Sequence, residues 1–415
     1  MRVLYLSQYF PPEVGATQTR AYEMARRLVA AGHEVTMLAE VPNHPAGVIA
    51  PAYRGKLWAR RRLAGIRVIR LWVITSPEKG FRARMLFYLS YMAMAILAGL
   101  AAGLRPRRRF DVIYATSPPL FVGLAGVVLS LLLRTPLVFE VRDLWPESAV
   151  ALGELSSRRA IRLAELVEGA CYRRARRIVV VTRGIERRLR ERGLSSGRVC
   201  LIPNGANVEE FRPQPERAAA LRRSLGIGDR FVAIYAGIHG IAQGMETLVE
   251  AARILEQSEP GIVMLLVGEG PRKAEVRRLV AEHGLTNVLM LDEQPRAAMA
   301  GYLSLAGCAI VPLRADPLFV GALPSKMFEG LACGTPVVLS APEGEASAVL
   351  AAAGAGIHVP PEDPPALAAA IRGLSADHAA SAEMGSRGRA FVTQHYTRGE
   401  GARRLEALLR EVVRQ

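Results

Sequence analysis

The feature that most constrains the fold of this 415-residue chain is an alternation of apolar strands with amphipathic helices that begins twice. The first round opens with the strand pattern RVLYLSQYF and continues through the loop PPEVGATQT and the helix pattern RAYEMARRLVAAG to a second strand, HEVTMLAE. A strand, a crossover helix and another strand predict a parallel βαβ unit. The strands that follow are continuous apolar runs, typical of a sheet covered by helices on both faces; they are GIRVIRLWV, DVIYATS, PLVFEV and RIVVVT.

The alternation starts again near Arg230 with the strand FVAIYAG and the helix METLVEAARILEQ, after a loop rich in Pro, Gly and Asn at 202–216. Such a loop is a natural linker, and the length suffices for two or more cores. We therefore predict an α/β protein with two doubly wound domains facing a cleft. The predicted boundaries are 1–204, 205–385 and a C-terminal segment, 386–415, whose helices pack back on the first domain.

Several loops that follow strands are rich in glycine, which lets backbone N–H groups approach an anion at a helix N-terminus. The spacing fits neither GxGxxG nor a Walker A loop, and each glycine taken alone is equally consistent with a tight strand-to-helix turn. The loops lie where a doubly wound sheet binds its ligand; they carry Gly237, Gly240 and Gly244, then Gly268 and Gly270, and, in the first domain, Gly15.

Lys326 and Glu329 lie three residues apart in the first turn of a predicted helix within ALPSKMFEGLACGTPVVLS. Lys326 can supply a point charge to a phosphate at the helix start, and Glu329 can accept hydrogen bonds from ligand hydroxyls. An ordinary surface ion pair is the alternative. The sequence has no DxD, HxxxH or HExxH spacing, so we expect no metal and no cofactor.

The formal net charge of +16 favours an anionic partner, while aromatic residues make up only 6% of the chain and lower the expectation of nucleic-acid binding. Residues 85–104 form a 20-residue run without a charged side chain, flanked by basic segments. The run meets the length criterion for a membrane span. Because it lies between strands of one predicted sheet, we expect instead a half-buried helix on an anionic membrane surface, with a plain core helix as the alternative.

Six segments, in this order along the chain, resemble family 4 retaining glycosyltransferases, which have the GT-B fold of two Rossmann-like domains: YFPPEVGA, GHEV, IPNGANVEEFRP, YAGIHGIAQGMETLVEA, LLVGEGP and PSKMFEGLACGTPVV. Further motifs, VRDLWPES among them, resemble a bacterial subgroup that assembles O-antigen, capsule and exopolysaccharide and includes fucosamine transferases. The resemblance spans nearly the whole chain.

The resemblance implies that Gly15 lies near the transferred sugar and diphosphate, that the other five glycines face phosphate or base, and that Glu329 holds the ribose. The chain departs from the family pattern at Gly321, where an acidic residue is usual, and at Ile238 and Gln243, where Arg and Lys are usual. These departures leave neutralisation of the diphosphate to Lys326, with Arg272 or Arg314 as a second cation. Gln243 stays a candidate for donor binding without a charge.

Three further side chains are candidates. Arg142 and Asp143 stand where the family often has a histidine; Asp143 could orient or deprotonate an acceptor hydroxyl and Arg142 could bind acceptor phosphate, or the two could simply pair with each other. His239 lies in the phosphate-facing turn and could reach a phosphate.

Together these features predict a metal-independent retaining glycosyltransferase of the hexosyl or N-acetylhexosaminyl type, with UDP as the expected nucleotide. The expected acceptor is a lipid-linked glycan of the undecaprenyl diphosphate type in cell-surface polysaccharide synthesis. Four cysteines without CxxC spacing indicate a reducing compartment, so we expect a cytoplasmic, peripheral membrane protein. A UDP-sugar 2-epimerase of the same fold and a non-catalytic scaffold stay open as alternatives.

Overall fold

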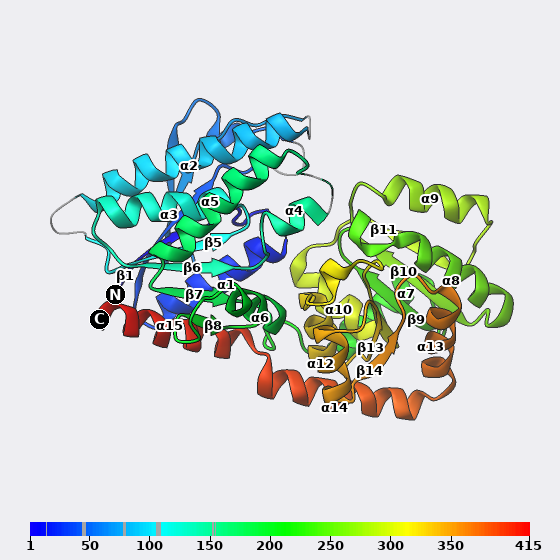
Figure 1. Cartoon of the computed structure of the whole chain (residues 1–415). Coiled ribbons are helices and arrows are strands. Elements are labelled where there is room, and N and C mark those ends of the chain that lie inside the picture. Colours follow the sequence, from blue (N-terminus) through cyan, green and yellow to red (C-terminus); the bar gives the residue numbers. More distant parts are fainter. Residues whose placement is uncertain (14, 44–46, 78–79, 105–108, 152, 154) are drawn as a thin grey trace. The chain divides into compact units, whose positions relative to one another are not determined.

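The computed structural model describes residues 1–415 except 14, 44–46, 78–79, 105–108, 152 and 154. The chain forms two compact units (Figure 1). Unit 1 comprises Met1–Pro203 and Gly399–Gln415, and unit 2 comprises Asn204–Arg398. Each unit has its own sheet and its own cores on both faces of that sheet.

Unit 1 is built on an eight-stranded sheet in the order β3-β4-β2-β1-β5-β6-β7-β8. Every neighbouring pair is parallel except β3 and β4, which form an antiparallel hairpin at one edge. The strands are β1 (Arg2–Leu6), β2 (Glu34–Glu40), β3 (Trp58–Leu63), β4 (Ile66–Leu71), β5 (Val112–Ser117), β6 (Leu137–Val141), β7 (Arg177–Val180) and β8 (Val199–Leu201).

Helices cover both faces of this sheet (Figure 1). One core joins the sheet to α2, α3, α5 and α6, and the other joins it to α1 and the C-terminal α15. The helices are α1 (Ala16–Ala30), α2 (Phe81–Gly103), α3 (Leu120–Leu132), α4 (Glu147–Ala151), α5 (Arg158–Arg174), α6 (Arg183–Glu191) and α15 (Arg398–Arg414), with one 3-10 turn, η1 (Pro51–Tyr53).

All but the last residue of the apolar run at 85–104 lies in α2, the one helix among the described residues that is long and apolar enough to cross a membrane. A core helix can have the same length and composition. In this fold α2 packs on α3 and on the sheet: Tyr91, Met94 and Ala98 are buried, and the Tyr91 hydroxyl donates to the Leu38 carbonyl at 2.8 Å. The opposite face of α2 exposes large apolar side chains, Leu86 and Leu97 among them. Half-burial of α2 is therefore confirmed.

Unit 2 has a six-stranded, fully parallel sheet in the order β11-β10-β9-β12-β13-β14. Its strands are β9 (Phe231–Ala236), β10 (Ile262–Val267), β11 (Val288–Leu291), β12 (Cys308–Pro312), β13 (Val337–Ser340) and β14 (Gly356–Val359). Its helices are α7 (Pro215–Ser224), α8 (Met245–Ser258), α9 (Lys273–Glu282), α10 (Arg296–Leu305), α11 (Ser325–Ala332), α12 (Glu345–Ala353), α13 (Pro364–Ala376) and α14 (His378–His395), with 3-10 turns η2 (Ile241–Gln243) and η3 (Pro317–Phe319).

The predicted pair of C-terminal helices corresponds to α14 and α15, but the two belong to different units. Val392 of α14 is buried in a core of unit 2, whereas Leu405, Leu409 and Val412 of α15 are buried in a core of unit 1. The chain thus returns to unit 1 only at Gly399.

Both sheets have the doubly wound strand order, in which the direction of winding reverses between two neighbouring strands. The reversal lies between β1 and β5 in unit 1 and between β9 and β12 in unit 2. Because the loops that leave the two strands turn to opposite faces of the sheet, a crevice forms outside their carboxyl ends, and ligands bind there in open α/β sheets. We therefore expect the functional residues in the loops after β1, β5, β9 and β12.

A buried ion pair ties α1 to the centre of the sheet in unit 1. Arg20 Nε donates to Glu140 Oε1 at 2.9 Å, and Arg20 also donates to the carbonyls of Ile202 and Pro203. Thr116 donates its hydroxyl to Glu140 at 2.6 Å. Burial alone would raise the pKa of Glu140, but Arg20, Arg142 and the Thr116 hydroxyl together lower it.

Replacement of Arg20 by Leu should therefore destabilise unit 1 strongly. The variant leaves the Glu140 carboxylate buried without its cation, which costs about 3–5 kcal/mol in comparable sites. Thermal unfolding followed by circular dichroism should show a clearly lower melting temperature. Glu250→Ala, which removes half-exposed pairs with Arg253 and His283, is the control and should cost less than about 1 kcal/mol. Equal melting temperatures for the two variants would contradict a structural role for Arg20.

Candidate functional site

The candidate site of unit 2 lies at the carboxyl ends of β9 and β12, where the sheet reverses its winding. Lys326, in the first turn of α11, reaches the end of β9. Its Nζ donates to the Tyr235 hydroxyl at 3.1 Å and lies 4.4 Å from the centroid of the Tyr235 ring. The Tyr235 hydroxyl in turn donates to the Ile238 carbonyl, so its lone pair is available to the ammonium.

The ammonium of Lys326 has no carboxylate partner among the described residues. Burial lowers the pKa of Lys326 to about 8, and Glu329 opposes that shift. Lys326 and Glu329 do not pair with each other, because Glu329 contacts two arginines instead. A half-buried ammonium held only by a phenol oxygen and an aromatic ring is suited to receive an anion from solvent.

The glycine turns after β9 and β10 are packed backbone to backbone. A Cβ added at Gly237 would overlap Lys326 Nζ, and one added at Gly268 would overlap the Gly237 carbonyl. The φ angles of these two glycines are 152° and 148°, which side-chain-bearing residues rarely adopt. The His239 N–H donates to the Glu269 carbonyl at 2.8 Å, linking the turns further. The two turns lie so close together that no side chain fits at Gly237 or Gly268, as the tight-turn interpretation predicts. The same packing brings Lys326 against the turn after β9.

Other predicted residues gather at the same turn. Gly244 is left-handed, with φ 54°, and precedes α8 directly. A Cβ at Gly240 would overlap the Gln243 side chain, and one at Gly270 would approach the His239 backbone. His239 is fully buried, and neither ring nitrogen has a hydrogen-bond partner among the described residues. Burial, followed by the charge of Lys273, lowers the pKa of His239 to about 4, so its imidazole is neutral at pH 7.

Arg272 and Arg314 flank this turn but are already engaged. Arg272 pairs with Glu246 and, at 2.7 Å, with Glu275. Arg314 Nε lies 3.0 Å from Glu362 Oε1, and the Arg314 N–H donates to the Ala242 carbonyl. Both guanidiniums are therefore near the turn and partly neutralised, whereas Lys326 has no ion-pair partner among the described residues.

Glu329 is held by two arginines that the sequence analysis did not single out. Glu329 Oε1 lies 3.0 Å from Arg398 Nη2 and 3.4 Å from Arg296 Nη1. Arg296 also pairs with Glu210 at 3.0 Å, and Arg398 Nε donates to the Gly205 carbonyl at 2.9 Å. The family resemblance assigns the Glu329 carboxylate to ribose. Through Arg398, the same carboxylate is also connected to the start and the end of unit 2.

In unit 1, Gly15 precedes α1, and Arg142 and Asp143 follow β6. Asp143 accepts a hydrogen bond from the Ser148 hydroxyl at 2.9 Å, and burial raises the pKa of Asp143. Nε and Nη1 of Arg142 are buried without a hydrogen-bond partner among the described residues. Burial lowers the pKa of Arg142, while nearby Glu140 opposes the shift. Asp143 thus bonds to Ser148, and the structure describes no ion pair between Arg142 and Asp143.

Signals for two of the missed residues were present in the sequence. Tyr235 and Glu140 each interrupt an otherwise apolar strand, FVAIYA and LVFEV. A polar group in a fully covered strand needs a partner, and here the partners are Lys326 and Arg20. Among the described residues, the structure holds no group of three or more His, Cys, Asp or Glu side chains that could bind a metal ion.

Comparisons with known proteins match a glycosyltransferase description to each half of the chain. The description "Glycosyl transferase 4-like domain" matches residues 15–205, and "Glycosyl transferases group 1" matches residues 218–391. One relative is the colanic acid biosynthesis glycosyl transferase WcaI of Escherichia coli K12. It is 25% identical over 349 residues, which cover 82% of this chain and 83% of WcaI.

Two solved structures share the fold over nearly the whole chain. Sucrose-phosphate synthase from Thermosynechococcus elongatus superposes with a TM-score of 0.75 at 24% identity and covers 99% of this chain and 98% of its own. Anabaena Alr3699/HepE in complex with UDP and glucose gives a TM-score of 0.74 at 18% identity, with 98% of both chains covered. With both halves matched in this order, the chain belongs to the group 1 glycosyltransferases, with a glycosyl transferase 4-like amino-terminal domain and the GT-B fold.

Proposed function

We propose that this glycosyltransferase moves a sugar from a nucleoside diphosphate donor, UDP-linked in the first instance, to a lipid-linked glycan, with retention of anomeric configuration. The sugar would be an N-acetylated amino sugar or a deoxy sugar, as in the O-antigen and exopolysaccharide subgroup that the sequence resembles. A single observation carries the proposal: the ammonium of Lys326, lacking a carboxylate partner, lies against the glycine turn after β9. The transferase matches across both halves support it over an epimerase or a scaffold.

In this proposal Lys326 neutralises the diphosphate as the bond to the sugar breaks. The N-terminus of α8 adds further positive potential, whereas most main-chain N–H groups of the 237–244 turn already donate to backbone carbonyls. Structures of Anabaena HepE with UDP and glucose and with UDP-glucose support a nucleotide-sugar donor on this fold. The neutral His239 would accept or donate one hydrogen bond without adding charge.

The chemistry requires no strong protein base. The acceptor hydroxyl attacks the anomeric carbon from the face that the diphosphate leaves, the glycosidic bond to the phosphate oxygen breaks, and that phosphate takes the hydroxyl proton. The products are the glycosylated acceptor and the nucleoside diphosphate. Protein groups replace a divalent ion in stabilising the leaving charge, so we propose metal-independent transfer.

The acceptor side is proposed to work at a membrane. Unit 1 carries sixteen of the nineteen large apolar residues that are exposed among the described residues. Four of them lie along α2: Phe81, Leu86, Leu89 and Leu97. The adjacent β3 bears three consecutive arginines, Arg60 to Arg62. Apolar side chains beside basic ones are typical of peripheral attachment to an anionic bilayer. We therefore place the protein on the cytoplasmic face of the plasma membrane, with an undecaprenyl diphosphate-type acceptor.

Replacement of Lys326 by Ala should weaken binding of UDP roughly 10- to 100-fold, because one charge-assisted contact to a phosphate is lost. Isothermal titration calorimetry with UDP, and with GDP in parallel, measures the effect and the base preference. The fold should persist, since the Tyr235 hydroxyl keeps its bond to Ile238. Lys56→Ala, in an exposed part of unit 1, is the control. Unchanged UDP affinity, or UDP release from the donor that EDTA abolishes and Mg²⁺ restores, would contradict the proposal.

Affinity for UDP should also fall as the pH rises above about 8. The folded-state pKa of Lys326 is about 8, so the free protein carries the ammonium below that pH and loses it above. Up to about tenfold weaker binding per pH unit is the limit for a single proton. Lys326→Arg keeps its charge throughout and should give a flat profile between pH 7 and pH 9.5. Parallel profiles for the two proteins would show that another group is responsible.

Vesicle binding should depend on the exposed face of α2. Replacing Leu86 and Leu97 together by Ser should weaken co-sedimentation with phosphatidylcholine–phosphatidylglycerol vesicles roughly tenfold or more, because less apolar surface leaves water. The matched control replaces two other exposed aliphatic residues, Val320 and Val413, by Ser. Failure of the wild-type protein to bind these vesicles at low salt would contradict membrane attachment.

A further inference from the structure

The face of the unit 1 sheet beneath α2 changes character along its strands. At the carboxyl ends it presents Leu6, Leu38 and Leu71, all buried in the core with α2. At the amino ends, the positions four residues earlier hold Arg2 on β1, Glu34 on β2 and Arg67 on β4. Because alternate residues of a strand share one face, these charges continue the same face as the buried leucines. The core therefore opens into a charged rim at this end of the sheet.

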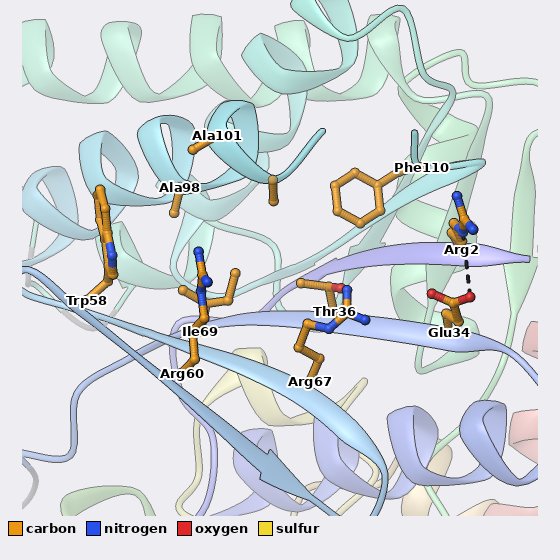
Figure 2. Close-up of a pocket in the computed structure, with 11 residues that line it drawn as sticks. Arg2, Glu34, Thr36, Trp58, Arg60, Arg67, Ile69, Ala98, Ala101 and Phe110 are labelled. Carbon is orange, nitrogen blue, oxygen red and sulfur yellow. Dashed lines mark ion pairs between the residues drawn. The ribbon is translucent and has the colours of Figure 1, made fainter. Parts of the chain in front are cut away.

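The rim encloses a pocket of about 160 Å³ beneath the C-terminal half of α2 (Figure 2). The helix contributes only small side chains here, Ala98, Ala101 and Ala102, which leave the space above the strands unfilled. Its other lining residues are Arg2, Glu34, Thr36, Trp58, Arg60, Arg67, Ile69 and Phe110. Pockets that enclose a drug-sized ligand measure about 300–1,000 Å³, so this one suits a headgroup rather than a nucleotide sugar.

The charge of the pocket is positive. Arg2 Nε lies 3.6 Å from Glu34 Oε1, so that pair is largely neutral. Arg60 and Arg67 have no ion-pair partner among the described residues. Arg60 is opposite Ile69 across the hairpin, and Arg67 is opposite Thr36, so both arginines rise from the strands on the side that faces α2. Two guanidiniums at one pocket are well suited to a phosphate.

The surroundings of the pocket are apolar. On α2, Leu97 is 57% exposed, and Leu104 just after the helix is 68% exposed. Trp58 lines the pocket from β3 while 46% exposed, and Leu57 before it is 62% exposed. A partly exposed tryptophan, with an apolar ring and a polar N–H, is typical of the boundary between headgroups and acyl chains. Ile69 and Phe110 make part of the lining apolar, which a free inorganic anion would not use.

We propose that this pocket binds the phosphate of an anionic membrane lipid, with Arg60 and Arg67 contacting the phosphate and the acyl chains lying along Leu97, Leu104 and Trp58. The proposal rests on the proposed membrane attachment and names the lipid contact that orients unit 1 there. The pocket is separate from the acceptor-side residues Arg142 and Asp143, which follow β6 at its carboxyl end. Arg2, Glu34 and Arg67 line the pocket from the amino ends of β1, β2 and β4, and Trp58 and Arg60 line it from β3, with four strands between β3 and β6. Strands of five to seven residues place the two ends roughly 15–20 Å apart.

The test uses the full chain and soluble short-chain lipids, so that binding is measured without a bilayer. Calorimetry with dihexanoyl phosphatidylglycerol below its micelle concentration should show saturable binding to the wild-type protein. The variant R60Q/R67Q should bind at least tenfold more weakly. The matched control R61Q/R187Q removes the same charge from unit 1, at one site on the same strand that faces away from the pocket, and should bind as the wild type does.

Two further probes distinguish the sources of the phosphate. Dihexanoyl phosphatidylcholine and inorganic phosphate should each bind at least tenfold more weakly than the anionic lipid. Inorganic phosphate that binds as tightly would make this a site for free anions and overturn the proposal. Equal weakening in R60Q/R67Q and R61Q/R187Q would assign the effect to diffuse surface charge and overturn it as well, as would no binding to the wild-type protein.

A readout at the other site keeps this proposal apart from the proposed transferase chemistry. R60Q/R67Q should bind UDP with unchanged affinity, because both arginines belong to unit 1 and Lys326 belongs to unit 2. A wild-type protein that binds the anionic lipid but not UDP would remove the donor assignment and leave the lipid pocket standing. A protein that binds UDP but not the lipid would do the reverse.

Discussion

An ammonium group held over a phenol ring at the reversal point of a parallel sheet is the interaction on which the site depends. Burial of Lys326 disfavours its charged form, which lowers its pKa to about 8. The Tyr235 ring and hydroxyl compensate only in part, and the nearest carboxylate, Glu329, is committed to two arginines. A doubly negative diphosphate would supply the missing charge. The glycines at 237 and 268 follow from this contact, because any side chain there would displace the ammonium or separate the two turns.

Glu329 connects this chemistry to the chain path of unit 2. Its partner Arg398 is the last residue of the unit and also donates to the carbonyl of Gly205, near the first. The backbone reinforces the junction, since the Arg398 N–H donates to Ala206 and the Ala206 N–H to Tyr396. A ligand hydroxyl that takes a hydrogen bond to Glu329 would compete with Arg398 for the same carboxylate. Under the donor role proposed for Glu329, donor binding and the anchoring of both ends of unit 2 would be linked through one side chain.

The sequence was sufficient for the parts of this structure that depend on local pattern. Strands such as Phe231–Ala236 and helices such as Met245–Ser258 follow from continuous apolar runs and helical periodicity, and the order of motifs carried the fold. Contacts between distant residues could not be derived in the same way. Tyr235 and Lys326 are 91 residues apart, and Glu329 and Arg398 are 69 apart, so only the folded chain brings them together. Arg272 and Arg314 were predicted near the diphosphate by position, but their pairing with Glu246 and Glu362 depends on side-chain packing that no spacing encodes.

The two ends of the unit 1 sheet differ for the same physical reason. A parallel strand buried on both faces must be apolar through its middle, so polar groups can only collect where the strands begin or end. At the carboxyl end of β6, Arg142 lies near the Arg20–Glu140 pair, and Asp143 follows it in the chain. At the amino ends the strands themselves carry the charges, and the small side chains of α2 leave a hollow above them. If the enzyme takes its acceptor from a membrane, as proposed, a single sheet with two polar ends could supply both the chemical site and a separate lipid contact without either interrupting the core.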